Sequence, residues 1–184
     1  IRLTYGEIND RANRFARCLQ NEGIRPGDRV ALLLENSPEY VVSYYGTLKA
    51  GAVAAPLNTD FKAEGLRESF LRLAPRVLVY SPRFERVLRN VDFTGFGLRL
   101  MIAGSTRLSP QEGGVSLVKW EEILEAGPAE NPNVSVEEGS LASIVLTSGT
   151  TGTGKGVMLS HRNIVSNTHA ICRYLELSGE DIHM

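Results

Sequence analysis

The chain has 184 residues, of which 42% are hydrophobic and 22% charged, and its formal net charge is −1. These values are typical of one globular domain with a single buried core. Basic residues are scattered among acidic ones, which argues against a nucleic-acid partner.

Cysteine usage and hydropathy bear on the compartment. Cys18 and Cys172 each lie in a helix-like apolar pattern and are interpreted as small core residues in a reducing compartment. No apolar stretch approaches the roughly 18 residues that a membrane-spanning helix needs. The first ten residues, IRLTYGEIND, lack the profile of a signal peptide. We therefore expect a cytoplasmic protein without a transmembrane segment, although the absence of an initiating Met leaves a missing leader open.

The first part of the chain alternates helical and extended patterns. Thr4 and Glu7 form a capping-box pattern ahead of apolar residues at helical spacing, and Gly23 follows as a stop. Ser37 and Pro38 supply the start of a second helix. The elements predicted in chain order are a helix at about 5–21, a strand at 29–35, a helix from 38 to Gly51, a strand at 52–58, a helix at 63–73, a strand at 76–81, a short helix from 82 and a strand at 98–104.

This alternation indicates βαβ units. We predict an α/β fold with a mainly parallel sheet and helices on both faces. Residues 105–140 are rich in Gly, Pro, Ser and acidic residues and are interpreted as surface connections around a short helix at 120–125. A strand at 141–146 then enters a glycine-rich segment, and ligands of such sheets collect at loops that leave the strands' carboxyl ends.

The segment LTSGTTGTGKGVMLSH, residues 146–161, follows a predicted buried strand and combines four glycines with Lys155 and five hydroxyl side chains that precede this lysine. Glycines let successive backbone N–H groups converge on an anion, and the lysine adds positive charge, so the loop suits a polyphosphate. A hairpin turn without a ligand is the simpler alternative.

The same segment is one residue short of a Walker A pattern, because Gly156 stands where that pattern has Ser or Thr. A Walker A loop also requires a helix directly after its lysine. Here VML is predicted to be extended, and the next helix start is Ser160, ahead of apolar residues at helical spacing. A P-loop NTPase is thus disfavoured, and an extended conformation over 156–159 would exclude it.

In a longer frame, LTSGTTGTGKGVMLSHRNIV resembles the phosphate-loop signature of the AMP-forming adenylating enzymes, the superfamily of acyl-CoA synthetases, peptide-synthetase adenylation domains and luciferases. The usual form is T-S-G-[ST]-T-G-x-P-K-G-V followed by H-x-N. The region LTYGEINDRANRFARCLQNEGIRPGDRVALLLENSPEYVVSYYGTLKAGAVAAPLN is similar to the amino-terminal part of the same family. Gly154 departs from the pattern, since the family usually has proline there, and this loosens the unliganded loop.

The resemblance implies that a carboxylate is activated by Mg·ATP and transferred to coenzyme A. In this reading, the β- and γ-phosphates are cradled by Thr147, Ser148, Gly149, Thr150, Thr151 and Gly152, and Lys155 offsets their charge. His161 and Asn163 belong to the pattern but are interpreted as helix-start residues. We assign no catalytic residue and no metal ligand within the 184 residues.

The family's adenine pocket, magnesium motif, ribose-binding aspartate and carboxyl-terminal lysine lie downstream of the phosphate loop. None is found before Met184. We therefore expect residues 1–184 to be the amino-terminal part of the large adenylating domain, without the carboxyl-terminal domain, inactive by itself and able to self-associate through exposed apolar surface.

Asn58 favours an acyl-CoA synthetase acting on a fatty or related acid, because amino-acid-activating domains usually have aspartate at this position. The expected ligands are a small carboxylate, ATP, Mg²⁺ and CoA. The alternatives are an amino-acid-activating domain, a P-loop NTPase and a non-catalytic module of the same fold.

Overall fold

A mostly parallel sheet crosses the computed structural model, which describes residues 2–104, 106, 115–126, 129–147, 155–179 and 181. Over these residues the sheet has seven strands in the order β5-β4-β3-β1-β2-β6-β7, and only β6 and β7 are antiparallel. The strands are β1 (Arg29–Leu33), β2 (Val53–Pro56), β3 (Val77–Tyr80), β4 (Leu100–Ala103), β5 (Ser116–Lys119), β6 (Leu141–Leu146) and β7 (Gly156–Ser160).

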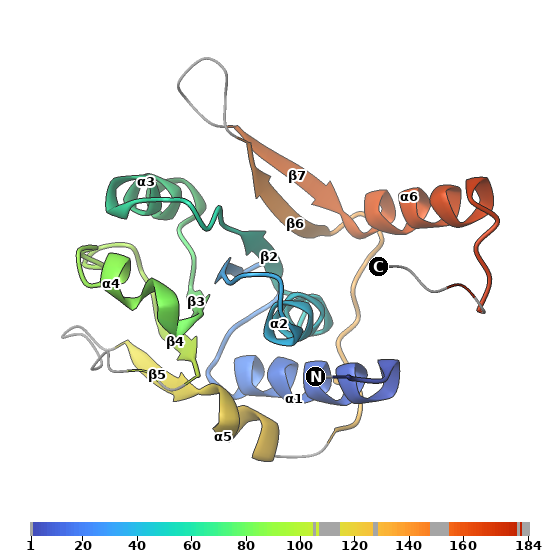
Figure 1. The fold of residues 1–184 in the computed structure, drawn as a ribbon, viewed down its shortest axis with the longest axis horizontal. Coiled ribbons are helices and arrows are strands. Elements are labelled where there is room, and N and C mark those ends of the chain that lie inside the picture. Colours follow the sequence, from blue (N-terminus) through green and yellow to red (C-terminus); the bar gives the residue numbers. More distant parts are fainter. Residues whose placement is uncertain are drawn as a thin grey trace.

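Helices cover both faces of this sheet, as predicted. Helices α1, α2 and α5 lie on one face, and α3 and α4 lie on the other (Figure 1). The helices are α1 (Tyr5–Asn21), α2 (Pro38–Lys49), α3 (Ala63–Leu73), the 3-10 helix η1 (Pro82–Phe84), α4 (Glu85–Leu88), α5 (Trp120–Glu125) and α6 (His161–Tyr174). The expected α/β fold is confirmed.

Alternating residues of the central strands build two clusters of the buried core, one on each face of the sheet. On β1, Val30 and Leu32 pack toward α1 and α2, whereas Ala31 and Leu33 pack toward α3 and α4. Because both faces are covered, these strands are nearly continuous apolar runs, as parallel strands usually are. Helices α1 and α2 approach closely at Gly46, where an added Cβ would lie 2.7 Å from Phe15 Cδ1.

Local capping fixes the helix starts. The backbone N–H of Glu7 donates to Thr4 Oγ1 at 3.2 Å, and the Thr4 N–H donates to Glu7 Oε2 at 2.7 Å, which completes the predicted capping box. Ser37 caps α2 by accepting from the Tyr40 N–H at 3.2 Å. These contacts lie within one helical turn, so the sequence pattern predicts them well.

Two sequence-based interpretations need correction. Residues 105–140 are not only surface connections, because Ser116–Lys119 form β5, parallel to β4. Cys172 is exposed rather than buried. Cys18 is partly buried, and burial raises the pKa of its thiol to about 12, so the thiol stays protonated and a nucleophilic role is disfavoured.

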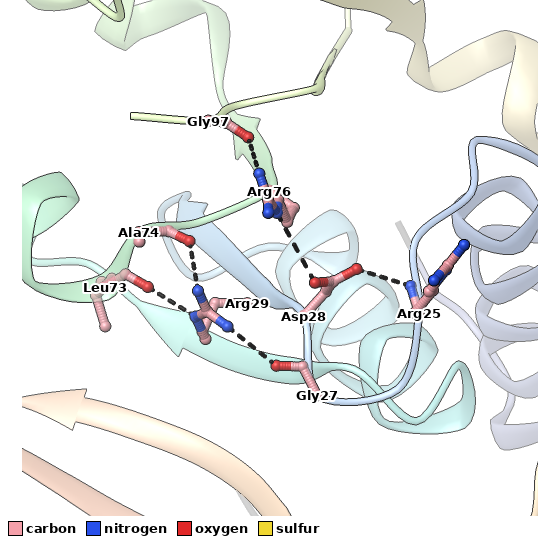
Figure 2. A network of polar contacts seen from close by, with 8 residues as sticks. All are labelled: Arg25, Gly27, Asp28, Arg29, Leu73, Ala74, Arg76 and Gly97. Carbon is pink, nitrogen blue, oxygen red and sulfur yellow. Dashed lines mark hydrogen bonds and ion pairs between the residues drawn. The ribbon is translucent and has the colours of Figure 1, made fainter. Parts of the chain in front are cut away.

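Charged side chains satisfy backbone carbonyls at the amino edge of the sheet (Figure 2). Arg29 donates from Nε to the Leu73 carbonyl at 2.7 Å and from Nη2 to the Ala74 carbonyl at 2.8 Å. These carbonyls lie at the end of α3, where Ala74 adopts a left-handed conformation with φ 41°. Arg76 Nη1 donates to the Gly97 carbonyl at 3.0 Å. The network therefore satisfies polar groups that a helix end leaves without partners.

Apolar side chains are exposed on β7 and α6. Met158 is 67% exposed and Val165 54%, and no described side chain of α6 is buried. Helix α6 therefore has no covering layer among the described residues. The helices of the described chain also include none with the length and apolar character needed to cross a membrane.

Candidate phosphate-binding site

The candidate site lies where β6 ends. Because β6 runs parallel to β2, Thr147 leaves β6 at the carboxyl edge of the sheet, and the chain returns at Lys155 into β7. The structure thus describes Thr147 and Lys155 of the predicted site. The other predicted site residues, Ser148, Gly149, Thr150, Thr151 and Gly152, lie outside the described residues.

Thr147 and Lys155 join the two ends of the glycine-rich segment. The Thr147 N–H donates to the Lys155 carbonyl at 2.8 Å, and Thr147 Oγ1 donates to the same oxygen at 3.2 Å. The Lys155 N–H in turn donates to Thr147 Oγ1 at 3.4 Å. Thr147 therefore uses its hydroxyl to close the neck of the segment.

The side chain of Lys155 is exposed beside this neck. It forms no ion pair with any carboxylate in the described part of the chain. An ammonium group without a protein counter-ion can bind an anionic ligand, and phosphate oxygens suit it well. Lys155 therefore presents an exposed positive charge beside the neck that Thr147 closes.

The segment after Lys155 is extended. Gly156 begins β7 and pairs with Leu146 of β6. An added Cβ at Gly156 would lie 3.2 Å from Ile144 Cγ2, so the hairpin is tightly packed at this position. A Walker A loop needs a helix here. The extended conformation of residues 156–159 therefore excludes the P-loop NTPase alternative.

His161 and Asn163 lie in the first turn of α6, as predicted. Asn163 Oδ1 accepts from the Ser160 N–H at 3.0 Å, and the Asn163 N–H donates to Ser160 Oγ at 3.2 Å. The His161 N–H donates to the Ser140 carbonyl at 3.1 Å. Burial lowers the pKa of the His161 imidazole, which favours its neutral form.

A concavity lies at the same edge of the sheet, between the ends of β1, β3 and β4. It encloses about 180 Å³. On its wall, Glu35 Oε1 accepts from Ser81 Oγ at 3.0 Å, while Glu35 Oε2 is buried without a hydrogen-bond partner in the described structure. Ser81 directly follows β3, and Glu35 lies two residues after the end of β1; neither was predicted to be a site residue.

Mg²⁺ is one of the ligands that the sequence resemblance implies. The described residues contain no group of three His, Cys, Asp or Glu side chains that could hold a metal ion. Magnesium is commonly bound through substrate phosphates with few protein ligands.

Known proteins resemble the chain over most of its length. Gramicidin S synthase 2 of Brevibacillus brevis is 34% identical over 183 residues, which are 97% of this chain and 4% of that protein. The 3-hydroxybenzoate–CoA/4-hydroxybenzoate–CoA ligase of Thauera aromatica is 32% identical over 171 residues, 89% of this chain and 30% of that protein.

Solved structures agree with this likeness. The N-terminal domain of FACL13 from Mycobacterium tuberculosis superposes with a TM-score of 0.75 at 33% identity, over 88% of this chain and 38% of that one. ATP-bound MatB from Rhodopseudomonas palustris gives 0.80 at 29% identity, over 97% and 34%. The chain thus spans 38% or less of each of these relatives.

A family model described as AMP-binding enzyme matches residues 1–184. The chain therefore belongs to the AMP-binding enzyme family, whose members include peptide synthetases and CoA ligases.

Proposed function

We propose that the chain supplies the phosphate-binding part of an AMP-forming acid–CoA ligase, as the amino-terminal part of its large adenylating domain. The observation that carries this proposal is the β6–β7 hairpin, which brings Thr147 together with Lys155 at the carboxyl edge of the sheet, where Lys155 forms no ion pair with a described carboxylate. In this role Lys155 neutralises phosphate charge, and the backbone N–H groups and hydroxyls of residues 148–152 complete the cradle.

The proposed reaction has two steps. A carboxylate oxygen of the substrate attacks the α-phosphorus of Mg·ATP, the bond to the β-phosphate oxygen breaks, and pyrophosphate leaves an acyl-adenylate. The CoA thiol then loses its proton and attacks the acyl carbon, so that AMP leaves and a thioester remains. The chain's own contribution is to position the leaving phosphates and stabilise their charge electrostatically.

A CoA ligase is preferred to an amino-acid-activating domain on two grounds. Hydroxybenzoate–CoA ligase is a relative, and the matched structures include a fatty acyl CoA synthetase. Asn58 is the second ground, although its Oδ1 accepts from the Asp60 N–H at 2.9 Å, a turn contact that aspartate could also make. The second candidate, amino-acid activation, is favoured by the peptide synthetases among the relatives.

Substrate-dependent isotope exchange tests this choice. The whole protein that carries this chain is incubated with ATP, labelled pyrophosphate and, separately, fatty, aromatic and amino acids. We expect exchange with a fatty or aromatic acid, and a CoA thioester once CoA is added. Exchange with an amino acid, and no thioester with free CoA, would instead establish the second candidate.

Two further features belong to this proposal. A cytoplasmic location agrees with Cys18 and Cys172, which are both free, because disulfides are rare in that compartment.

Self-association is proposed through the exposed apolar side chains of β7 and α6, since contiguous apolar surface of this kind favours contacts between molecules.

A further inference from the structure

A buried hydroxyl joins the hairpin to the parallel sheet. Ser143 of β6 is fully buried, and its Oγ donates to the carbonyl of Ala54 on β2 at 2.9 Å. The two residues are also register partners, and they form the one register pair between β2 and β6 in the described structure. Strand β6 is therefore attached to β2 over a very short length, with a side chain reinforcing the attachment.

The sequence of β2 explains why the attachment is short. The N–H groups of Val53 and Leu57 donate toward β1, to the carbonyls of Asp28 at 2.8 Å and Leu32 at 2.9 Å. Alternate residues of a strand direct their backbone groups to opposite neighbours, so Ala54 and Pro56 face β6. Proline has no N–H. Beyond Ala54, β2 thus presents no donor to β6 at the next position.

A bulge in β6 directs Ser143 inward. The register with β7 shifts between Leu141 and Ser143, so that two residue steps along β6 face one step along β7, and Ser143 is buried directly after this shift. Bulges of this kind bend a strand and redirect a side chain. After the bulge, β6 continues with β7 as its partner, and the hairpin extends beyond β2 (Figure 1).

We infer that Ser143 is a positioning residue for the phosphate-binding site. Its hydroxyl fixes the base of the β6–β7 hairpin on β2, and the hairpin carries Thr147 and Lys155 at its other end. Ser143 acts through the backbone of β6 and does not itself contact the ligand. This role rests on the proposed function, since it assumes that the hairpin presents a phosphate-binding segment.

The test compares pyrophosphate binding and hydrogen exchange in four proteins: the parent, Ser143→Ala, Ser143→Thr and Ser69→Ala. Ser69 is the matched control, because it is also buried and donates from Oγ to a backbone carbonyl, that of Gly65, at 2.7 Å, but it lies on α3. We expect Ser143→Ala to weaken pyrophosphate binding about tenfold, because small displacements of binding groups are costly. Ser143→Thr should restore binding, and Ser69→Ala should leave it unchanged.

Amide hydrogen exchange separates this inference from the proposed function. Ser143→Ala should accelerate exchange at 144–146 and 157–159 more than at β1 and β3, whether or not pyrophosphate binds, and Ser69→Ala should not. If the parent does not bind pyrophosphate but Ser143→Ala still exchanges faster in the hairpin alone, the phosphate site is refuted and Ser143 remains the anchor of the hairpin. Unchanged binding together with unchanged hairpin exchange in Ser143→Ala would overturn the inference. If Ser143→Ala does not fold, Ser143→Cys, a similar side chain with a weaker donor, replaces it.

Discussion

At the scale of single residues, the amino edge of the sheet depends on Arg29. Its guanidinium donates to the carbonyls of Leu73 and Ala74, which end α3, and to the Gly27 carbonyl at 3.3 Å (Figure 2). Arginine suits this role because its planar group presents several donors in fixed directions. Without it, the end of α3 would have to find other partners.

We therefore predict that Arg29→Met lowers the free energy of unfolding by about 1–3 kcal/mol, because backbone carbonyls lose their donors. Arg29→Lys should recover only part of this loss, since lysine cannot contact three carbonyls in this geometry. Arg86→Met, at an exposed position on α4, serves as the control. Urea unfolding measures all three variants, and equal midpoints for Arg29→Met and Arg86→Met would contradict the prediction.

Within the predicted site, the side chains of Thr147 and Lys155 have different contacts. The sequence assigns Thr147 and Lys155 to one phosphate cradle. In the structure, however, the Thr147 hydroxyl bonds to the backbone of Lys155, whereas the Lys155 side chain is exposed and unpaired among the described residues. A sequence pattern indicates which residue types gather in a loop, but not which of them already have partners.

At the scale of elements, prediction succeeds where the determining contacts are local. The bounds of α1, α3, α5 and β6 match the expected ranges. For α1 the capping contacts lie within one turn. Strand β5 was missed because it lies at the edge of the sheet: its outer residues Ser116 and Lys119 are exposed, and the apolar signal is limited to Leu117 and Val118.

Pro56 shows that a rule based on local sequence can predict where a strand ends and still not predict the place of that strand in the sheet. A proline in a strand is expected where the strand ends or lies at the edge of a sheet. Strand β2 does end at Pro56, yet it is an internal strand between β1 and β6. The missing N–H matters only on the side of β6. The pairing of β6 with β2 through Ser143 joins residues 89 positions apart, and no local pattern contains it.

At the scale of the whole molecule, the sheet separates scaffold from site. Its amino edge carries the Arg29 network, and its carboxyl edge carries the hairpin neck and the Glu35 concavity. The fold and the family could be predicted because periodicity, caps and a long motif agree. The arrangement of the carboxyl edge could not, since it depends on which strands become neighbours.

The exposed apolar surface gives a prediction at this scale. Side chains on β7 and α6, including Met158, Val165 and Tyr174, lack cover among the described residues. We expect the 184-residue chain to self-associate as its concentration rises, because burial of apolar area drives association. Sedimentation velocity at several concentrations measures this, and a constant monomer value would contradict it.

Pyrophosphate binding by the chain shows whether the β6–β7 hairpin carries a phosphate site. Titration calorimetry compares the parent with Lys155→Ala and with Lys62→Ala, which removes the same charge at an exposed position without a capping bond. We predict that Lys155→Ala binds about tenfold or more weakly, since a hydrogen bond to a charged group contributes about 1.5–3 kcal/mol, while Lys62→Ala binds like the parent. Equal affinity in all three proteins, or no binding by the parent, would contradict a phosphate site at the β6–β7 hairpin.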